Sequence, residues 1–160
     1  METGFGYWLR RCLAALLSLL LAALLCTALA AIAQTQFNLA SLQALGVEVP
    51  LGVRLRTTGA DLLGFSPTFG PIAAVGFLVA FPAAAALGRW LPGARRWLYA
   101  LAGALAILTA MLLMQRIFML TPVAAARSTA GLLALCASGA VGGLLFAWLL
   151  ARRRESQLAS

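Results

Sequence analysis

The chain has 160 residues, of which 63% are hydrophobic, and it carries a formal net charge of +8 with arginine as its only basic residue. A soluble domain of this size cannot bury so much apolar surface, so the composition indicates a membrane protein. The chain has no histidine and only three cysteines, none of them in a CxxC pair, which removes the commonest haem ligand, the commonest general base and a redox dithiol.

The sequence contains four apolar runs, at residues 13–33, 71–91, 97–120 and 129–151. Each run is long enough to cross a bilayer, because a helical crossing needs about 20 apolar residues for about 30 Å of hydrocarbon. We therefore predict an all-α integral membrane protein, in which residues 1–160 form a single membrane domain built as a four-transmembrane-helix bundle.

The first apolar run follows Arg10 and Arg11 and ends in small-x-small patterns just before Gln34, so residues 1–33 have two interpretations. Such a segment is either a cleaved signal peptide or a transmembrane helix that is retained. Its apolar part covers residues 13–33, whereas the apolar region of a signal peptide has about 7 to 15 residues. The length favours a retained first span.

Residues 34–70 are the longest stretch between apolar runs, and we predict that they form a structured outer loop. Asn38 stands where it would cap a short helix, with Phe37 and Leu42 as a hydrophobic staple and Gly46 at the end. We expect this short helix to lie on the membrane surface.

Within this loop, residues 47–56 fit two structures equally well. Apolar and polar residues alternate, which predicts a small β-hairpin that turns at Pro50 and sets Glu48 opposite Arg54. In the alternative, a helix starts with Pro50 at its first position, where proline is well tolerated.

The rest of the loop carries signals for helix starts and breaks. Thr58 and Asp61 have the spacing of a capping box, which predicts another short helical turn before Gly64. Ser66-Pro67 and Gly70-Pro71 then predict a break before the second span.

Pro82 stands inside the second span and leaves the Leu78 carbonyl without its usual helical partner, which predicts a kink. Prolines of this kind are common in membrane helices, so the kink has a purely structural interpretation. A gating hinge is the alternative.

The arginines predict the orientation, because cytoplasmic segments carry an excess of basic residues. With both termini in the cytoplasm, eight arginines lie on that side and at most four on the other. The same orientation sets all the tryptophans and tyrosines near the cytoplasmic interface, where such rings concentrate. We therefore predict a multi-pass protein of a bacterial-type inner (plasma) membrane, with both termini cytoplasmic and with no nucleic-acid-binding face. The cytoplasmic arginines are Arg10, Arg11, Arg89, Arg95, Arg96, Arg152, Arg153 and Arg154.

Small residues recur at helical spacing along the fourth span, and Gly139 and Gly143 add a GxxxG motif on a neighbouring face. Membrane helices approach one another closely where the side chains are small. These glycines are expected either to pack inside the bundle or to mediate assembly with another copy or another protein.

Gln115 and Arg116 form a polar pair inside the third apolar run. A charged residue at membrane depth is a candidate functional residue, here as part of an electropositive outer mouth that attracts anions. The structural interpretation is that Arg116, about one turn from the end of its span, reaches the headgroups or pairs with Glu48 or Asp61.

The sequence offers little catalytic chemistry. It has four acidic residues and no carboxylate pair, catalytic triad, glycine-rich phosphate loop or metal-ligand cluster. General acid–base catalysis therefore lacks its usual groups. We predict no enzymatic activity, no cofactor and no metal site.

These observations lead to two functional hypotheses. The first is a non-enzymatic structural, accessory or assembly subunit that acts through helix packing and its outer loop. The alternative is a small oligomeric channel or transporter component with an electropositive outer mouth around Arg116. The expected partners are membrane lipids and either further copies of the chain or a larger membrane complex.

Overall fold

The computed structural model describes residues 4–118 and 123–158. Within these ranges every regular element is a helix, and four helices are long and apolar enough to cross a membrane. This confirms the predicted all-α chain with four helices of membrane-crossing length. In chain order the elements are α1 (Gly4–Ala44), α2 (Leu51–Leu87), the 3₁₀ helix η1 (Pro92–Ala94), α3 (Arg95–Phe118), the 3₁₀ helix η2 (Ala124–Arg127) and α4 (Thr129–Leu158).

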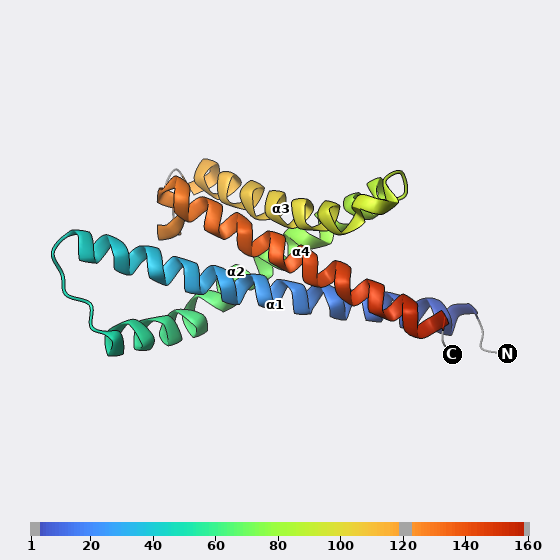
Figure 1. The fold of residues 1–160 in the computed structure, drawn as a ribbon, viewed down its shortest axis with the longest axis horizontal. Helices are drawn as coiled ribbons and strands as arrows, with labels where there is room; N and C mark the ends of the chain where they lie inside the picture. Colours follow the sequence, from blue (N-terminus) through green and yellow to red (C-terminus); the bar gives the residue numbers. More distant parts are fainter. Residues whose placement is uncertain (1–3, 119–122, 159–160) are drawn as a thin grey trace.

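The four long helices pack in up-and-down order (Figure 1). α1 packs against α2, α2 against α3, α3 against α4, and α4 returns against α1, whereas α2 and α4 touch only slightly across the diagonal. The start of α1, the α2–α3 turn and the end of α4 lie at one end of the molecule, which we call the terminal end. The α1–α2 connection, the end of α3 and η2 lie at the other, the linker end.

Helices α1 and α2 are much longer than one membrane crossing. They have 41 and 37 residues, and at about 1.5 Å per residue both exceed about 30 Å of hydrocarbon by more than 20 Å. The predicted loop over 34–70, with its separate short helices, is therefore wrong. Residues 34–44 continue α1, residues 51–70 belong to α2, and only residues 45–50 connect them.

The helix end predicted at Gly46 is confirmed, but the helix start predicted at Asn38 is wrong. Asn38 lies inside α1 and not at a helix start. Gly46 has a φ of +83°, and its amide donates to the Gln43 carbonyl at 3.0 Å, while the Val47 amide donates to the Leu42 carbonyl at 3.2 Å. These two bonds form a Schellman motif, whose left-handed position favours glycine.

The β-hairpin predicted for residues 47–56 is wrong, because residues 51–56 form the first turns of α2. Pro50 is the N-cap residue, with φ −59° and ψ 154°, and its carbonyl accepts a helical hydrogen bond from the Arg54 amide at 3.1 Å. The alternative of a helix that starts at Pro50 is thus confirmed to within one residue. Proline fits there because its ring fixes φ and no amide donor is needed. Glu48, expected opposite Arg54 in the hairpin, lies exposed in the connection.

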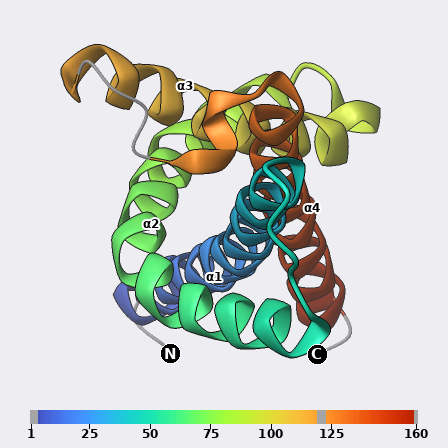
Figure 2. The ribbon, with the colours of Figure 1, turned by 90° about the vertical axis from the view of Figure 1, so that its left-hand side faces the viewer.

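The helix start predicted at Thr58 and the break predicted at Pro67 and Pro71 are also wrong, since all three residues lie inside α2. The Thr58 hydroxyl donates to the Arg54 carbonyl at 2.8 Å, a bond back to the preceding turn of a continuing helix. Together with Pro82, these prolines each remove a helical hydrogen bond and favour bending. Figure 2, which views the molecule from the linker end, shows α2 curving around α1.

Aromatic rings fill the centre of the bundle. The Phe81 ring stacks on Phe77 with 4.6 Å between centroids and on Phe146 with 4.5 Å, and it meets Tyr99 edge-on at 5.7 Å. All four residues are buried. Because stacked and edge-on pairs contribute about 0.5–1.5 kcal/mol each beyond area burial, this cluster ties α2, α3 and α4 together.

Helices α3 and α4 pack backbone against backbone. A Cβ atom on Gly103 would collide with the Gly139 carbonyl, one on Gly139 with the Gly103 carbonyl, and one on Gly143 with the Tyr99 carbonyl. Glycine alone permits this approach because it has no side chain. Gly139 and Gly143 therefore serve packing inside the bundle, one of the two roles expected of them.

Candidate functional site

The structure distributes the predicted candidate residues over several parts of the molecule. Gln115 and Arg116 lie exposed in the last turns of α3. Pro82 lies inside α2 with its side chain exposed, and Gly139 and Gly143 are buried against α3. The sequence candidates therefore do not converge on one site.

Asp61 joins the two long helices beyond the apolar part of α1. Its carboxylate accepts a hydrogen bond from the Thr35 hydroxyl at 2.7 Å. One turn away the Gln36 amide nitrogen donates to the Thr58 hydroxyl at 3.4 Å. Asp61, considered from the sequence as a partner for Arg116, thus has a partner on α1 instead.

Arg54 makes a third connection between these helices. Its guanidinium donates to the side-chain carbonyl of Gln43 at 3.0 Å, close to the connection between α1 and α2. Hydrogen bonds of this kind, to a charged donor, stabilise by about 1.5–3 kcal/mol where they are shielded from water and by less where they are exposed. We call residues 34–70 the α1–α2 hairpin, since these bonds hold its two helical segments antiparallel.

The α1–α2 hairpin exposes several large apolar side chains. Leu45 is 80% exposed, Leu51 77% and Leu55 71%, and Val47 and Val53 are half-exposed between them. Exposed apolar side chains that gather in one place mark a surface that contacts a partner or a membrane. They flank the connection, at the far end of the molecule from the chain termini.

A cavity of about 310 Å³ lies beside Asp61, where α2 meets α1 and the end of α3. Its walls combine apolar side chains, among them Phe65 and Met114, with the polar Asp61 and Gln34. The side-chain carbonyl of Gln34 is buried and has no hydrogen-bond partner among the described residues. The polar part of this cavity therefore offers hydrogen-bond acceptors.

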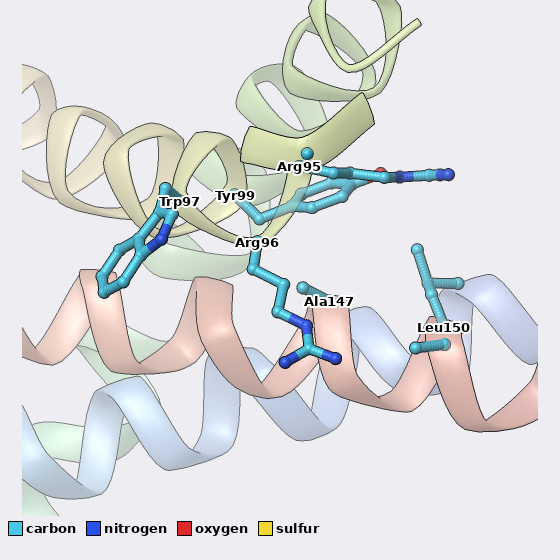
Figure 3. Close-up of a pocket in the computed structure, with 8 residues that line it drawn as sticks. Arg95, Arg96, Trp97, Tyr99, Ala147 and Leu150 are labelled. Atoms are coloured by element: carbon cyan, nitrogen blue, oxygen red, sulfur yellow. The ribbon is translucent and has the colours of Figure 1, made fainter. Parts of the chain in front are cut away.

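A second cavity, of about 410 Å³, lies at the terminal end, between the first turns of α3 and the last turns of α4 (Figure 3). Arg95 and Arg96 line it from α3, and Ala147 and Leu150 line it from α4. In Figure 3 the Arg96 side chain points from α3 toward α4, while Arg95 extends along the ring of Tyr99. We call this space the basic cavity.

An aromatic ring packs against one of the two arginines that line the basic cavity. The guanidinium carbon of Arg95 lies 5.9 Å from the ring centroid of Tyr99, a side chain that is only 2% exposed. On α4, outside the residues that line the cavity, the Arg152 guanidinium lies 4.3 Å from the centroid of the Trp148 ring. Cation–π contacts of this kind hold a guanidinium in place without consuming its hydrogen-bond donors.

The charges are unevenly distributed between the two ends. The sequence assigns eight arginines to the terminal end against Glu2 and Glu155. The acidic residues whose side chains the structure describes, Glu48 and Asp61, both belong to the α1–α2 hairpin at the linker end. The basic cavity is therefore suited to an anion.

Sequence reasoning missed the basic cavity, because it treated these arginines only as signals of orientation. A detectable signal was present, since arginine and tryptophan are neighbours both at the start of α3, in Arg96-Trp97, and near the end of α4, in Trp148 and Arg152. In an antiparallel helix pair the start of one helix lies beside the end of the other, so both clusters lie at the terminal end.

The described residues offer no set of metal ligands, since no three His, Cys, Asp or Glu side chains in residues 4–118 and 123–158 lie together. Cys26 is buried, with its sulfur 3.6 Å from the Ser138 hydroxyl oxygen on α4.

Comparisons with protein-family models, with curated proteins and with solved structures find no match for this chain. The class of protein therefore follows from the helices themselves. Four helices of membrane-crossing length and composition, packed in up-and-down order, are those of a multi-pass membrane protein.

Proposed function

We propose that the chain is a non-enzymatic accessory or assembly subunit of a bacterial-type inner membrane, and that its α1–α2 hairpin docks a partner subunit. The observation that carries this proposal is the exposure of Leu45, Leu51 and Leu55 on a hairpin whose helices are hydrogen-bonded to each other. An apolar surface on a hairpin that is held together by hydrogen bonds is suited to binding another protein.

The lengths of α1 and α2 support a position for this surface outside the hydrocarbon. The apolar run of α1 ends at residue 33, and the polar Gln34, Thr35 and Gln36 follow. Residues 37–44 add about 12 Å of helix beyond that point, since each residue advances about 1.5 Å. Apolar side chains in this position are in water or among headgroups unless a partner covers them.

The surroundings of the leucines define the chemistry of the partner. Arg56 is exposed one residue after Leu55, and Arg54 lies nearby with one of its nitrogens bonded to Gln43. Glu48 is also exposed, in the connection between the same leucines, so an interface of this composition has an apolar centre and a rim whose net charge is positive. We therefore propose a partner subunit with an apolar patch bordered by acidic residues, which this rim would attract and orient.

The orientation is part of the same proposal. Both termini face the cytoplasm and the hairpin faces the opposite side, because the arginines concentrate at the terminal end. Reporter domains fused after residue 160 and inserted between Gly46 and Val47 test it. The terminal fusion should be active only as a cytoplasmic reporter and the inserted one only as an external reporter, and the reverse pattern contradicts the orientation.

The alternative, a channel or transporter component around Arg116, has less support. Arg116 is exposed at the end of α3, and the buried rings of Phe77, Phe81 and Phe146 stack on one another inside the bundle. A conducting path through one copy of the chain would have to pass these rings.

Site-specific photo-crosslinking in intact membranes tests the docking proposal. A photoreactive residue in place of Leu55 should yield one discrete adduct with another protein, whereas the same residue in place of Leu101, which is exposed on α3, should yield adducts with lipid. Leu51→Ser should remove the protein adduct at position 55. Gly59→Ala, on the same hairpin with open space around it, should leave the adduct unchanged.

Three results would contradict docking to a partner subunit. Adducts at position 55 that contain only lipid would place the hairpin on the membrane surface. Adducts with a second copy of this chain would indicate a homo-oligomer. A protein adduct that survives Leu51→Ser as well as Gly59→Ala would show that the leucines do not form the contact.

A further inference from the structure

The basic cavity combines positive charge with an adjoining apolar surface. Arg96 is exposed and points toward α4, and Arg95 is half-buried against Tyr99. Ala147 and Leu150 of α4 form the facing wall. The cavity volume of about 410 Å³ is large enough for a phosphate group with its ester substituents.

The arginines determine the charge and shape of a fitting ligand. A guanidinium presents paired donors that match two oxygens of a phosphate, and it is less strongly hydrated than an ammonium group. Arg96 points from α3 toward α4, whereas Arg95 extends along the Tyr99 ring, so Arg96 presents its donors to the facing wall and Arg95 adds positive charge beside it. A phosphate-bearing anion is therefore the ligand class that this cavity recognises.

The outer face of α3 continues from the cavity as an apolar stripe. Trp97 lines the cavity, and Leu101 and Leu105 follow it at intervals of four residues, which places all three on one side of a helix. They are 71%, 56% and 49% exposed. A stripe of this length and composition provides a surface along which an acyl chain can lie.

We propose that the basic cavity is a binding site for the headgroup of an anionic phospholipid. Arg96 binds the phosphate and Arg95 adds positive charge beside it. The indole of Trp97 lies at the level of the glycerol backbone, and an acyl chain runs along Leu101 and Leu105. Basic pockets between membrane helices on the cytoplasmic side bind anionic headgroups in this manner. The bound lipid bridges α3 and α4 beside the contact of Gly143 with Tyr99, at the terminal end.

The test uses the full-length protein in a neutral detergent, with native mass spectrometry after addition of phosphatidylglycerol or phosphatidylcholine. The wild-type chain should retain phosphatidylglycerol and lose phosphatidylcholine. Arg96→Gln should reduce retention of phosphatidylglycerol about ten-fold, the loss expected for a charge-assisted hydrogen bond. Arg96→Lys should fall between the two, because lysine keeps the charge and loses the paired donors.

Arg89→Gln is the matched control, because Arg89 is an exposed arginine at the same end that does not line the cavity. It should retain phosphatidylglycerol as the wild type does. Equal losses in Arg89→Gln and Arg96→Gln would overturn the site in favour of general charge attraction. Equal retention of the two lipids by the wild type would also overturn it.

Two further measurements distinguish a site for a phospholipid from a site for a free phosphate compound. Soluble glycerol phosphate should displace the lipid only weakly, because it lacks the acyl chain. If it displaces the lipid as strongly as short-chain phosphatidylglycerol does, the cavity is a site for free phosphate compounds instead. Leu105→Ser should weaken lipid retention although it leaves the arginines unchanged. Arg96 is exposed, so Arg96→Gln should elute as the wild type does in size-exclusion chromatography.

Discussion

The hydroxyl group of Thr35 on α1 donates a hydrogen bond of 2.7 Å to the carboxylate of Asp61 on α2. Thr35 is fully buried and Asp61 is half-buried. This bond joins α1 to α2 where the α1–α2 hairpin meets the rest of the bundle.

Thr35→Val should therefore lower the free energy of unfolding by about 1–3 kcal/mol, because a buried donor to a carboxylate is removed. Denaturant titration of the purified protein, followed by circular dichroism, measures this change. Thr57→Val is the control, since the Thr57 hydroxyl donates only to the Val53 carbonyl of its own helix at 2.9 Å. If Thr35→Val costs no more than the control, the bond does not stabilise the hairpin.

Gly143→Ala should destabilise the protein by about 1–3 kcal/mol, because its Cβ atom collides with the Tyr99 carbonyl and forces α3 and α4 apart. Gly59→Ala should instead stabilise by about 0.5–1 kcal/mol, since alanine is the better helix former and the space around Gly59 is open. Thermal unfolding of both variants checks the opposite signs. A Gly143→Ala protein as stable as the wild type would falsify the close backbone contact.

Phe81→Ala should cost about 3–5 kcal/mol, because it removes the ring that stacks on both Phe77 and Phe146 and leaves a cavity in the core. Leu78→Ala, on the same helix but 56% exposed, should cost clearly less. The same unfolding titration compares the two. Equal losses would mean that the aromatic cluster does not hold the bundle together.

Arg116→Ala should change the free energy of unfolding by no more than about 0.5 kcal/mol, because Arg116 is exposed at the end of α3. Anion flux into liposomes that contain the purified protein should be equally unaffected. Arg56→Ala serves as the comparison for an exposed arginine of the linker end. A change in flux that is specific to Arg116→Ala would restore the hypothesis of an electropositive mouth.

The wrong predictions in residues 34–70 share one physical cause. Asn38, Thr58 and Pro67 are local signals of helix ends, and each signal shifts the balance by about 1–3 kcal/mol. The contacts between α1 and α2, such as that of Thr35 with Asp61, outweigh these signals and keep both segments helical. Local preference decides a helix boundary only where tertiary contacts do not.

The candidate sites, too, were predictable from the sequence only in part. The arginines at the terminal end were predicted as a group, because their number and position next to apolar runs are properties of the sequence. The basic cavity was not predicted, because Arg96 and Leu150 are far apart in the chain and line one cavity only when α3 and α4 pack antiparallel. Likewise, the GxxxG motif of α4 was evident, but its contact with Gly103 depends on which face of α4 turns to α3.

The sequence by itself determined the number of long helices and their apolar character, since transfer of each side chain from water to lipid depends on residue type and run length alone. It also determined the end of α1 at Gly46, because a left-handed residue favours glycine. Only the tertiary structure decided how far α1 and α2 extend, which partner Asp61 has and where the arginines form a cavity. These depend on side chains distant in the chain, whose contacts exist only after the helices have packed.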